Sequence, residues 1–116
     1  MEKPTEAALA LFDAAFPADA RAERKKMFGM PAAFVNGNMF YGVFHNGVVM
    51  RVGEGRRDEI ASGHDGIQAF EPMPGRPWKE YIHADADLWA DSDELAGWIA
   101  EALELTAAMP AKNSKK

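Results

Sequence analysis

The apolar pattern between residues 26 and 52 predicts three antiparallel strands. Two Asn-Gly pairs, Asn36-Gly37 and Asn46-Gly47, lie ten residues apart, and apolar runs flank both of them. Asn-Gly between alternating apolar residues is a strong hairpin signal, because a type I′ turn needs positive φ at both central residues. Two such turns in succession predict a meander in which Ala32 lies opposite Tyr41 and His45 lies opposite Val48.

Directly opposed residues share a face of a sheet, so this register divides the meander into two faces. The first face is almost wholly apolar and is expected to pack on helices; it carries Ala32, Phe34, Met39, Tyr41, Val43, His45, Val48, Met50 and Val52. The second face carries Ala33, Val35, Asn38, Phe40, Gly42, Phe44, Val49 and Arg51. A sheet face left in water shows cleaner alternation. We therefore expect Val35, Phe40, Phe44 and Val49 to be covered, by the chain's own segments or by a second subunit. A one-residue error in either loop would exchange the faces.

The rest of the chain predicts helices before, within and after further strands. We expect a helix over residues 4–16, a helical turn or extended lead-in over 19–26, a short helix over 56–61, strands over 67–70 and 78–83, and irregular structure or a helical turn over 84–90. A last helix, capped by Asp91 and ended by Pro110, would bury Leu95, Trp98, Ile99, Ala102, Leu103, Thr106 and Met109. This order predicts an α+β fold: a two-layer domain with a five-stranded antiparallel sheet and helices on one face, over residues 1–110. Residues 111–116 are expected to be a disordered basic tail.

Composition narrows the class of protein without naming an activity. The 116 residues are 47% hydrophobic and 27% charged, as in a single globular domain. The sequence has no cysteine, which excludes disulfides and thiol chemistry and fits a reducing cytoplasm. No signal peptide or apolar run of about 20 residues indicates export or a membrane span. The net charge of −5 argues against direct nucleic-acid binding.

The sequence offers no recognisable catalytic or metal-binding motif. His45, His64 and His83 are far apart and are most simply surface or rim histidines, so no metal site is expected. No nucleophile has a base at a recognisable spacing. We therefore expect a protein that is not an enzyme and that needs no cofactor.

Two segments are candidate binding sites. Gly53, Gly55, Arg56 and Arg57 follow a strand and open a helix, where backbone N–H groups favour anions, although Glu54 would repel phosphate. A glycine-marked turn with solvated arginines is the simpler interpretation. The basic residues of 21–26 are likewise best explained as a solvated face.

The segment from Glu71 to Tyr81 is the second candidate, because it holds three prolines and presents Met73, Arg76 and Trp78. Met, Arg and Trp are enriched at protein interfaces. A stiff hairpin whose Trp78 caps the core explains the segment equally well.

These segments together resemble the N-terminal domain of the TfoX/Sxy family. The resemblance lies in the run from Arg24 to Gly29, in Phe34 to Phe40, in the second turn with Val48 to Val52, and in Phe70 to Tyr81. It covers about residues 20 to 108 and implies a two-layer α/β domain with an antiparallel sheet, similar to the secretion-chaperone fold. Two-domain TfoX/Sxy proteins regulate natural competence and act with the cyclic-AMP receptor protein. We expect a stand-alone domain without that second domain, so the regulatory role does not transfer directly.

The sequence thus favours a stand-alone, non-enzymatic protein-interaction or regulatory module in the cytoplasm. Its partner would be another protein or a second copy of the chain, and its interface would include Val35, Phe40, Phe44, Val49, Met73, Arg76 and Trp78. The alternative is a domain that binds an anion or a nucleotide at Gly53, Gly55, Arg56 and Arg57.

Overall fold

The fold is a mixed helix and antiparallel-sheet domain of the α+β class, seen in a computed structural model that describes residues 4–27, 30–71, 75, 78–89 and 93–110. Its elements are α1 (Glu6–Ala14), β1 (Glu23–Met27), β2 (Met30–Val35), β3 (Asn38–Phe44), β4 (Gly47–Arg51), α2 (Glu54–Gly63), β5 (Ile67–Ala69), β6 (Tyr81–Asp85), α3 (Ala86–Trp89) and α4 (Asp93–Ala107). Within these ranges no helix has both the length and the apolar composition required to cross a membrane.

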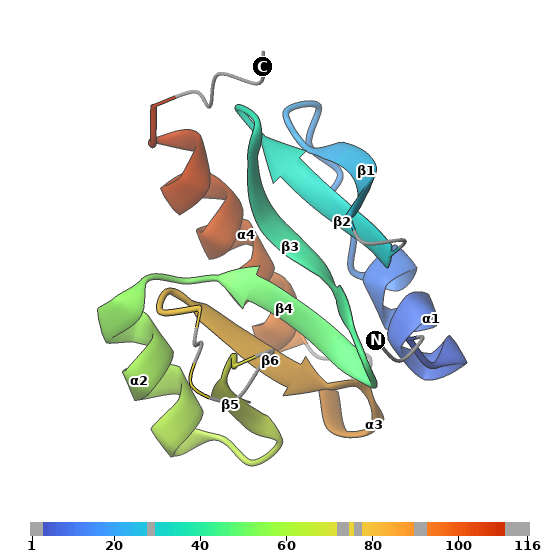
Figure 1. Ribbon diagram of the computed structural model, residues 1–116, viewed down its shortest axis with the longest axis vertical. Helices are drawn as coiled ribbons and strands as arrows, with labels where there is room; N and C mark the ends of the chain where they lie inside the picture. Colours follow the sequence, from blue (N-terminus) through green and yellow to red (C-terminus); the bar gives the residue numbers. More distant parts are fainter. Residues whose placement is uncertain (1–3, 28–29, 72–74, 76–77, 90–92, 111–116) are drawn as a thin grey trace.

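The strands of this part of the chain form one sheet in the order β1-β2-β3-β4-β6-β5, and all neighbours are antiparallel (Figure 1). The sheet has six strands, so the expectation of five is wrong. The additional strand is β1, in the segment for which a helical turn or an extended lead-in was expected. It pairs with β2 from Glu23 opposite Phe34 to Met27 opposite Met30.

Strand β1 forms because its long basic side chains find partners on both faces of the sheet. The guanidinium of Arg24 lies over the rings of Phe12 and Phe16, at 5.1 and 4.6 Å, and pairs with the Asp13 carboxylate at 2.8 Å. On the opposite face, Lys25 lies 5.5 Å from the ring of Phe34. A charged edge strand also resists pairing with other chains. The segment is therefore a strand rather than a helical turn, and the side chains of Arg24, Lys25 and Lys26 stay exposed, as expected for a solvated face.

The first Asn-Gly turn is confirmed, with φ of 55° at Asn36 and 76° at Gly37. The second turn lies one residue earlier than expected. Phe44 pairs with Gly47, so His45 and Asn46 form the loop, and His45 takes the positive φ of 53°. The expected pairing of His45 with Val48 is therefore wrong. The pairing of β3 with β4 changes by two residues, since Val43 lies opposite Val48 rather than Met50. Side chains alternate with a period of two, so the residues of both strands keep their expected faces after this turn.

A bulge at Phe40 exchanges the faces of the first hairpin. Ala33 lies opposite Tyr41 and Phe34 lies opposite Met39, which leaves Phe40 as an extra residue on β3. Phe40 and Val35 consequently join the core on the helix side of the sheet, and both are buried. Their expected place on the second face is wrong. Phe34 and Met39 lie on that second face instead, beside the side chains of Trp78 and Tyr81.

Helices α1 and α4 cover one face of the sheet, and α4 passes behind β3 and β4 in Figure 1. The stripe expected on the last helix is buried as far as Thr106, whereas Met109 is only half-buried and Asp91 lies outside the described residues. Tyr41 joins α1 to the sheet: its ring stacks on Phe12 at 4.7 Å and its hydroxyl donates to the Phe12 carbonyl at 3.0 Å. The opposite face carries no described helix.

Candidate interaction face

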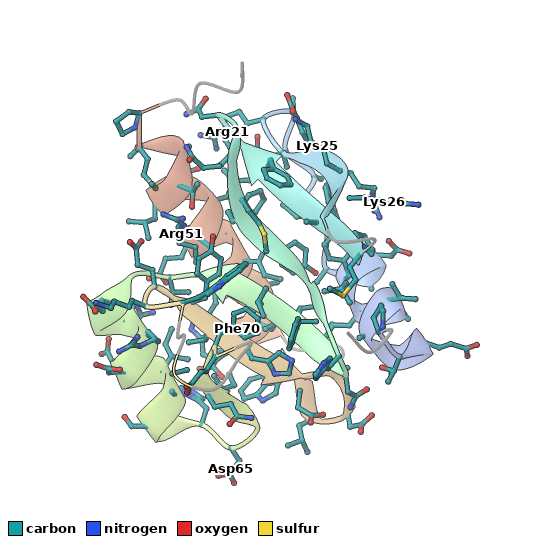
Figure 2. The ribbon with its side chains drawn as sticks, viewed as in Figure 1. Arg21, Lys25, Lys26, Arg51, Asp65 and Phe70 are labelled. Atoms are coloured by element: carbon teal, nitrogen blue, oxygen red, sulfur yellow. The ribbon has the colours of Figure 1, made fainter. Side chains whose placement is uncertain are left out.

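The face of the sheet without a helix carries a second apolar cluster, which we call the aromatic face. It consists of Met39, Phe44, Val49, Phe70, Trp78 and Tyr81. In Figure 2 the side chains of Phe70 and Arg51 lie over the sheet, on the side opposite α4. Residues from β3, β4 and β6, and from the connection between β5 and β6, meet here because their alternate positions point away from the helices.

Ring contacts make the aromatic face continuous. Phe70 meets the ring of Phe44 edge-on at 4.8 Å and that of Trp78 at 5.1 Å, and Trp78 in turn meets Tyr81 at 5.1 Å. These rings bury Val49, which is 1% exposed. Met39, Phe44 and Trp78 remain half-buried at the outside of the cluster. The chain's own side chains therefore cover Val49, while Phe44 is only partly buried.

A hollow of about 370 Å³ opens at one end of the aromatic face. We call it the Arg51 hollow; it is lined by Phe34, Asn38, Met39, Arg51, Trp78, Lys79, Glu80 and Tyr81. Arg51 Nε donates to the Tyr81 hydroxyl at 3.1 Å, and that hydroxyl donates to the Met39 carbonyl at 2.7 Å. Burial raises the pKa of Tyr81, although the Arg51 guanidinium opposes this effect. Tyr81 is therefore a neutral group that fixes the guanidinium.

A second hollow, of about 330 Å³, lies at the other end of the face. Phe44, His45, Gln68, Ala69, Phe70, Glu71 and His83 line it. His83 Nε2 lies 2.9 Å from the Phe44 carbonyl oxygen, and burial lowers the pKa of His83. The ring of His45 stacks on that of Phe44 at 4.1 Å. Two histidines that are 38 residues apart in the sequence thus border one hollow.

The family model of the TfoX N-terminal domain matches residues 16–106 of this chain. The chain belongs to the TfoX N-terminal domain family. Searches of curated proteins and of solved structures returned no match. The matched range runs from the end of α1 nearly to the end of α4, so it contains every residue of the aromatic face and of both hollows.

The candidate anion site of this TfoX N-terminal domain is already neutralised by its own carboxylates. Arg56 makes a two-pronged contact with Glu101 at 2.7 and 3.0 Å and also pairs with Glu59. Arg57 pairs with Asp58 and donates to the Lys79 carbonyl at 2.6 Å. The backbone N–H of Gly53 donates to the Glu80 carbonyl, whereas Gly55 is exposed. These arginines tie α2 to α4 and to the start of β6 rather than point together at an open space.

The remaining candidates divide between the aromatic face and other places. Trp78 lies in the aromatic face, where it packs on Phe70 and Tyr81, whereas Met73 and Arg76 lie outside the described residues. His64 does not line the hollow that His45 and His83 border, and it contacts Glu94 of α4 at 3.2 Å. Nowhere in the described ranges do three metal-ligating side chains converge.

Sequence reasoning missed Arg51 as a member of a site. It places Arg51 correctly on the second face, but it gives no reason to expect Tyr81 and Glu80 beside it. Those contacts depend on β6 pairing with β4, with Arg51 opposite Tyr81, across an intervening helix and strand. No local motif signals that pairing.

Proposed function

We propose that this TfoX N-terminal domain is a non-enzymatic protein-interaction module and that its partner docks on the aromatic face. The observation that carries the proposal is the asymmetry of the sheet. Helices bury one face, while Met39, Phe44 and Trp78 on the other stay partly exposed around the buried Val49. Aromatic residues, Met and Arg are enriched in protein interfaces, and the residues that dominate binding cluster in such patches.

The partner is a protein, either another chain or a second copy of this one. A regulatory role would follow from this contact, in keeping with the competence regulation by two-domain TfoX/Sxy proteins. The absence of cysteine supports a cytoplasmic site of action. The likeness to the secretion-chaperone fold stays a prediction. That fold is a two-layer domain with an antiparallel sheet, and the sheet of this chain is compatible with it.

The anion-binding alternative has less support from the geometry. A phosphate at Arg56 would have to displace two carboxylates, Glu101 and Glu59, from the guanidinium. Multiple short contacts to carboxylates make such an exchange unfavourable. We therefore place the binding function on the sheet.

Affinity capture with matched variants tests the proposal. The bait is the full chain, and the variant Phe44→Gln removes a partly exposed ring from the aromatic face. The control Leu88→Gln removes a larger exposed apolar surface, because Leu88 is 64% exposed on α3. We expect the wild type and the Leu88 variant to retain the same protein in stoichiometric amount, and the Phe44 variant to lose it. Light scattering of the purified chain shows whether that protein is a second copy.

Equal thermal unfolding of the three baits ensures that any loss reflects the surface rather than the fold. A partner retained by the Phe44 variant but lost by the Leu88 variant would place the interface on the helix side. A chain that is monomeric and retains no protein would refute the interaction function.

A further inference from the structure

The Arg51 guanidinium is the least neutralised buried cation on the aromatic face. Its side chain is only 19% exposed, yet its one carboxylate partner in the described part of the chain, Glu80, is 3.4 Å away and half exposed. Its other contacts within these ranges are with neutral groups: the Tyr81 hydroxyl accepts from Nε, the Met109 sulfur accepts from Nη1 at 3.1 Å, and the guanidinium carbon lies 5.1 Å from the centre of the Tyr81 ring. Thioether sulfur is a weak acceptor. Among the described residues none accepts a hydrogen bond from Nη2.

A cation removed from water is costly unless an anion compensates it. Arg56 shows what full compensation looks like in the same chain, with two short bonds to Glu101 and a third to Glu59. For Arg51 the contact with a described carboxylate is a long one, from Nη1 to Glu80 at 3.4 Å. The guanidinium therefore retains capacity for an anion, and its planar fork suits a carboxylate.

The surroundings of Arg51 also define the body of the ligand. Phe34, Met39, Trp78 and Tyr81 supply apolar and aromatic walls to the hollow. Its volume of about 370 Å³ lies in the range of small-molecule sites, roughly 300–1,000 Å³. Lys79 adds a positive charge, and among the described residues of the lining Glu80 is the carboxylate. Glu80 repels a dianionic phosphate more strongly than a monocarboxylate, and a phosphate would also leave the apolar walls without a partner.

We propose that the Arg51 hollow binds a small organic carboxylate with an aromatic body. The carboxylate pairs with the guanidinium, and the ring packs against Phe34, Trp78 and Tyr81. This site goes beyond the proposed function. It shares Met39, Trp78 and Tyr81 with the aromatic face but not Phe44, so the Phe44 variant distinguishes the two.

Two-dimensional amide NMR of the full chain tests the site with 3-phenylpropionate as the probe. Its amide, 3-phenylpropionamide, keeps the ring and loses the charge, while acetate keeps the charge and loses the ring. We expect saturable shifts at Trp78 and Tyr81 with the acid, and binding at least about tenfold weaker with the amide, because hydrogen bonds to charged groups carry this much affinity. Acetate should bind more weakly still.

Protein variants assign the effect to Arg51. Arg51→Gln should weaken binding of the acid about tenfold or more. Arg21→Gln is the matched control, because Arg21 is a surface arginine held by Asp19 and Glu104. It should bind as the wild type does, and so should Phe44→Gln. If Arg51→Gln does not fold, Arg51→Lys keeps the charge, loses the fork and should still weaken binding.

Several results would overturn the site. They are equal binding of acid and amide, no saturable shift, or unchanged binding by a folded Arg51 variant. Failure of the acid, with binding of a peptide that contains Phe-Glu, would assign Arg51 to a protein partner and reject the small-molecule site. Loss of acid binding in Arg51→Gln with normal protein capture separates this proposal from the proposed function.

Discussion

At the scale of single residues, Gly47 shows how the sheet sets the requirement for glycine. Its backbone φ is not positive, so the turn does not demand it. A Cβ at this position would overlap the Ala84 carbonyl oxygen and lie 2.7 Å from the His83 ring. Gly47 is therefore needed because β6 approaches β4 closely at Gly47, the first residue of β4.

We expect Gly47→Ala to lower the free energy of unfolding by about 1–3 kcal/mol, as overpacked buried sites do. Gly97→Ala is the matched control, because it stands inside α4 and its added Cβ would meet no described atom within 4 Å apart from its chain neighbours and the surrounding backbone of its own helix. That variant should raise the free energy of unfolding by roughly 0.5–1 kcal/mol. Urea denaturation measures both. A neutral Gly47→Ala variant would contradict the close approach of β6.

At the scale of elements, His64 joins the end of α2 to the start of α4. Its Nδ1 lies 2.9 Å from the Ile60 carbonyl oxygen and its Nε2 lies 3.2 Å from a Glu94 oxygen. Its ring packs edge-on against Trp98 at 4.9 Å. Two acceptors favour the doubly protonated ring, so the pKa of His64 is raised, chiefly by the Ile60 carbonyl and also by Glu94.

This junction predicts a pH-dependent contribution to stability. The pKa of His64 in the folded chain lies above its ordinary value of 6.5. The stabilisation that protonated His64 gives the fold is therefore complete below pH 6.5 and is lost as pH rises through the raised pKa. The stability difference between the wild type and His64→Gln should therefore shrink as pH rises. Chemical denaturation across this pH window measures it.

His83 provides a control of opposite sign, since burial lowers its pKa. The stabilisation that neutral His83 gives the fold is present above its ordinary pKa and is lost as pH falls through the lowered pKa. The stability difference between the wild type and His83→Gln should grow as pH rises. If His64→Gln followed this second trend, the contact between α2 and α4 would be wrong.

The elements also show what the sequence could predict. The α4 stripe from Leu95 to Thr106 and the turn at Asn36-Gly37 follow from local periodicity and turn chemistry, and both are confirmed. Residues 19–26 predict either a helical turn or an extended lead-in, and the contacts of Arg24 with Phe12 and Phe16, which decide for strand β1, are not visible in the local sequence. Contacts with residues distant in the sequence therefore decide whether such a segment forms a strand.

The candidate face was only partly predictable for the same reason. A second apolar face of the meander was expected, and Phe44 and Val49 lie on it. Val35 and Phe40 do not, because the bulge at Phe40 reverses their direction, and no local motif marks a bulge. The contacts of Arg51 with Tyr81 and Glu80, and the place of Phe70, depend on the pairing of β6 with β4 and β5, which is a long-range property.

At the scale of the whole molecule, the fold separates a helix-covered face from an aromatic face. One edge of the sheet is the basic strand β1 and the other is the three-residue strand β5. Charged and very short edges discourage strand addition. The aromatic face is thus the surface that we expect a partner to use, and its half-buried rings are where binding should be visible.

Hydroxyl-radical footprinting of the chain, alone and in complex with the protein captured by the wild type, tests this central claim most directly. Phe44 and Trp78 report on the aromatic face, and Leu88 reports on α3. The account predicts that the partner protects Phe44 and Trp78 from oxidation and leaves Leu88 unchanged. Protection of Leu88 with unchanged oxidation of Phe44 and Trp78 would contradict it.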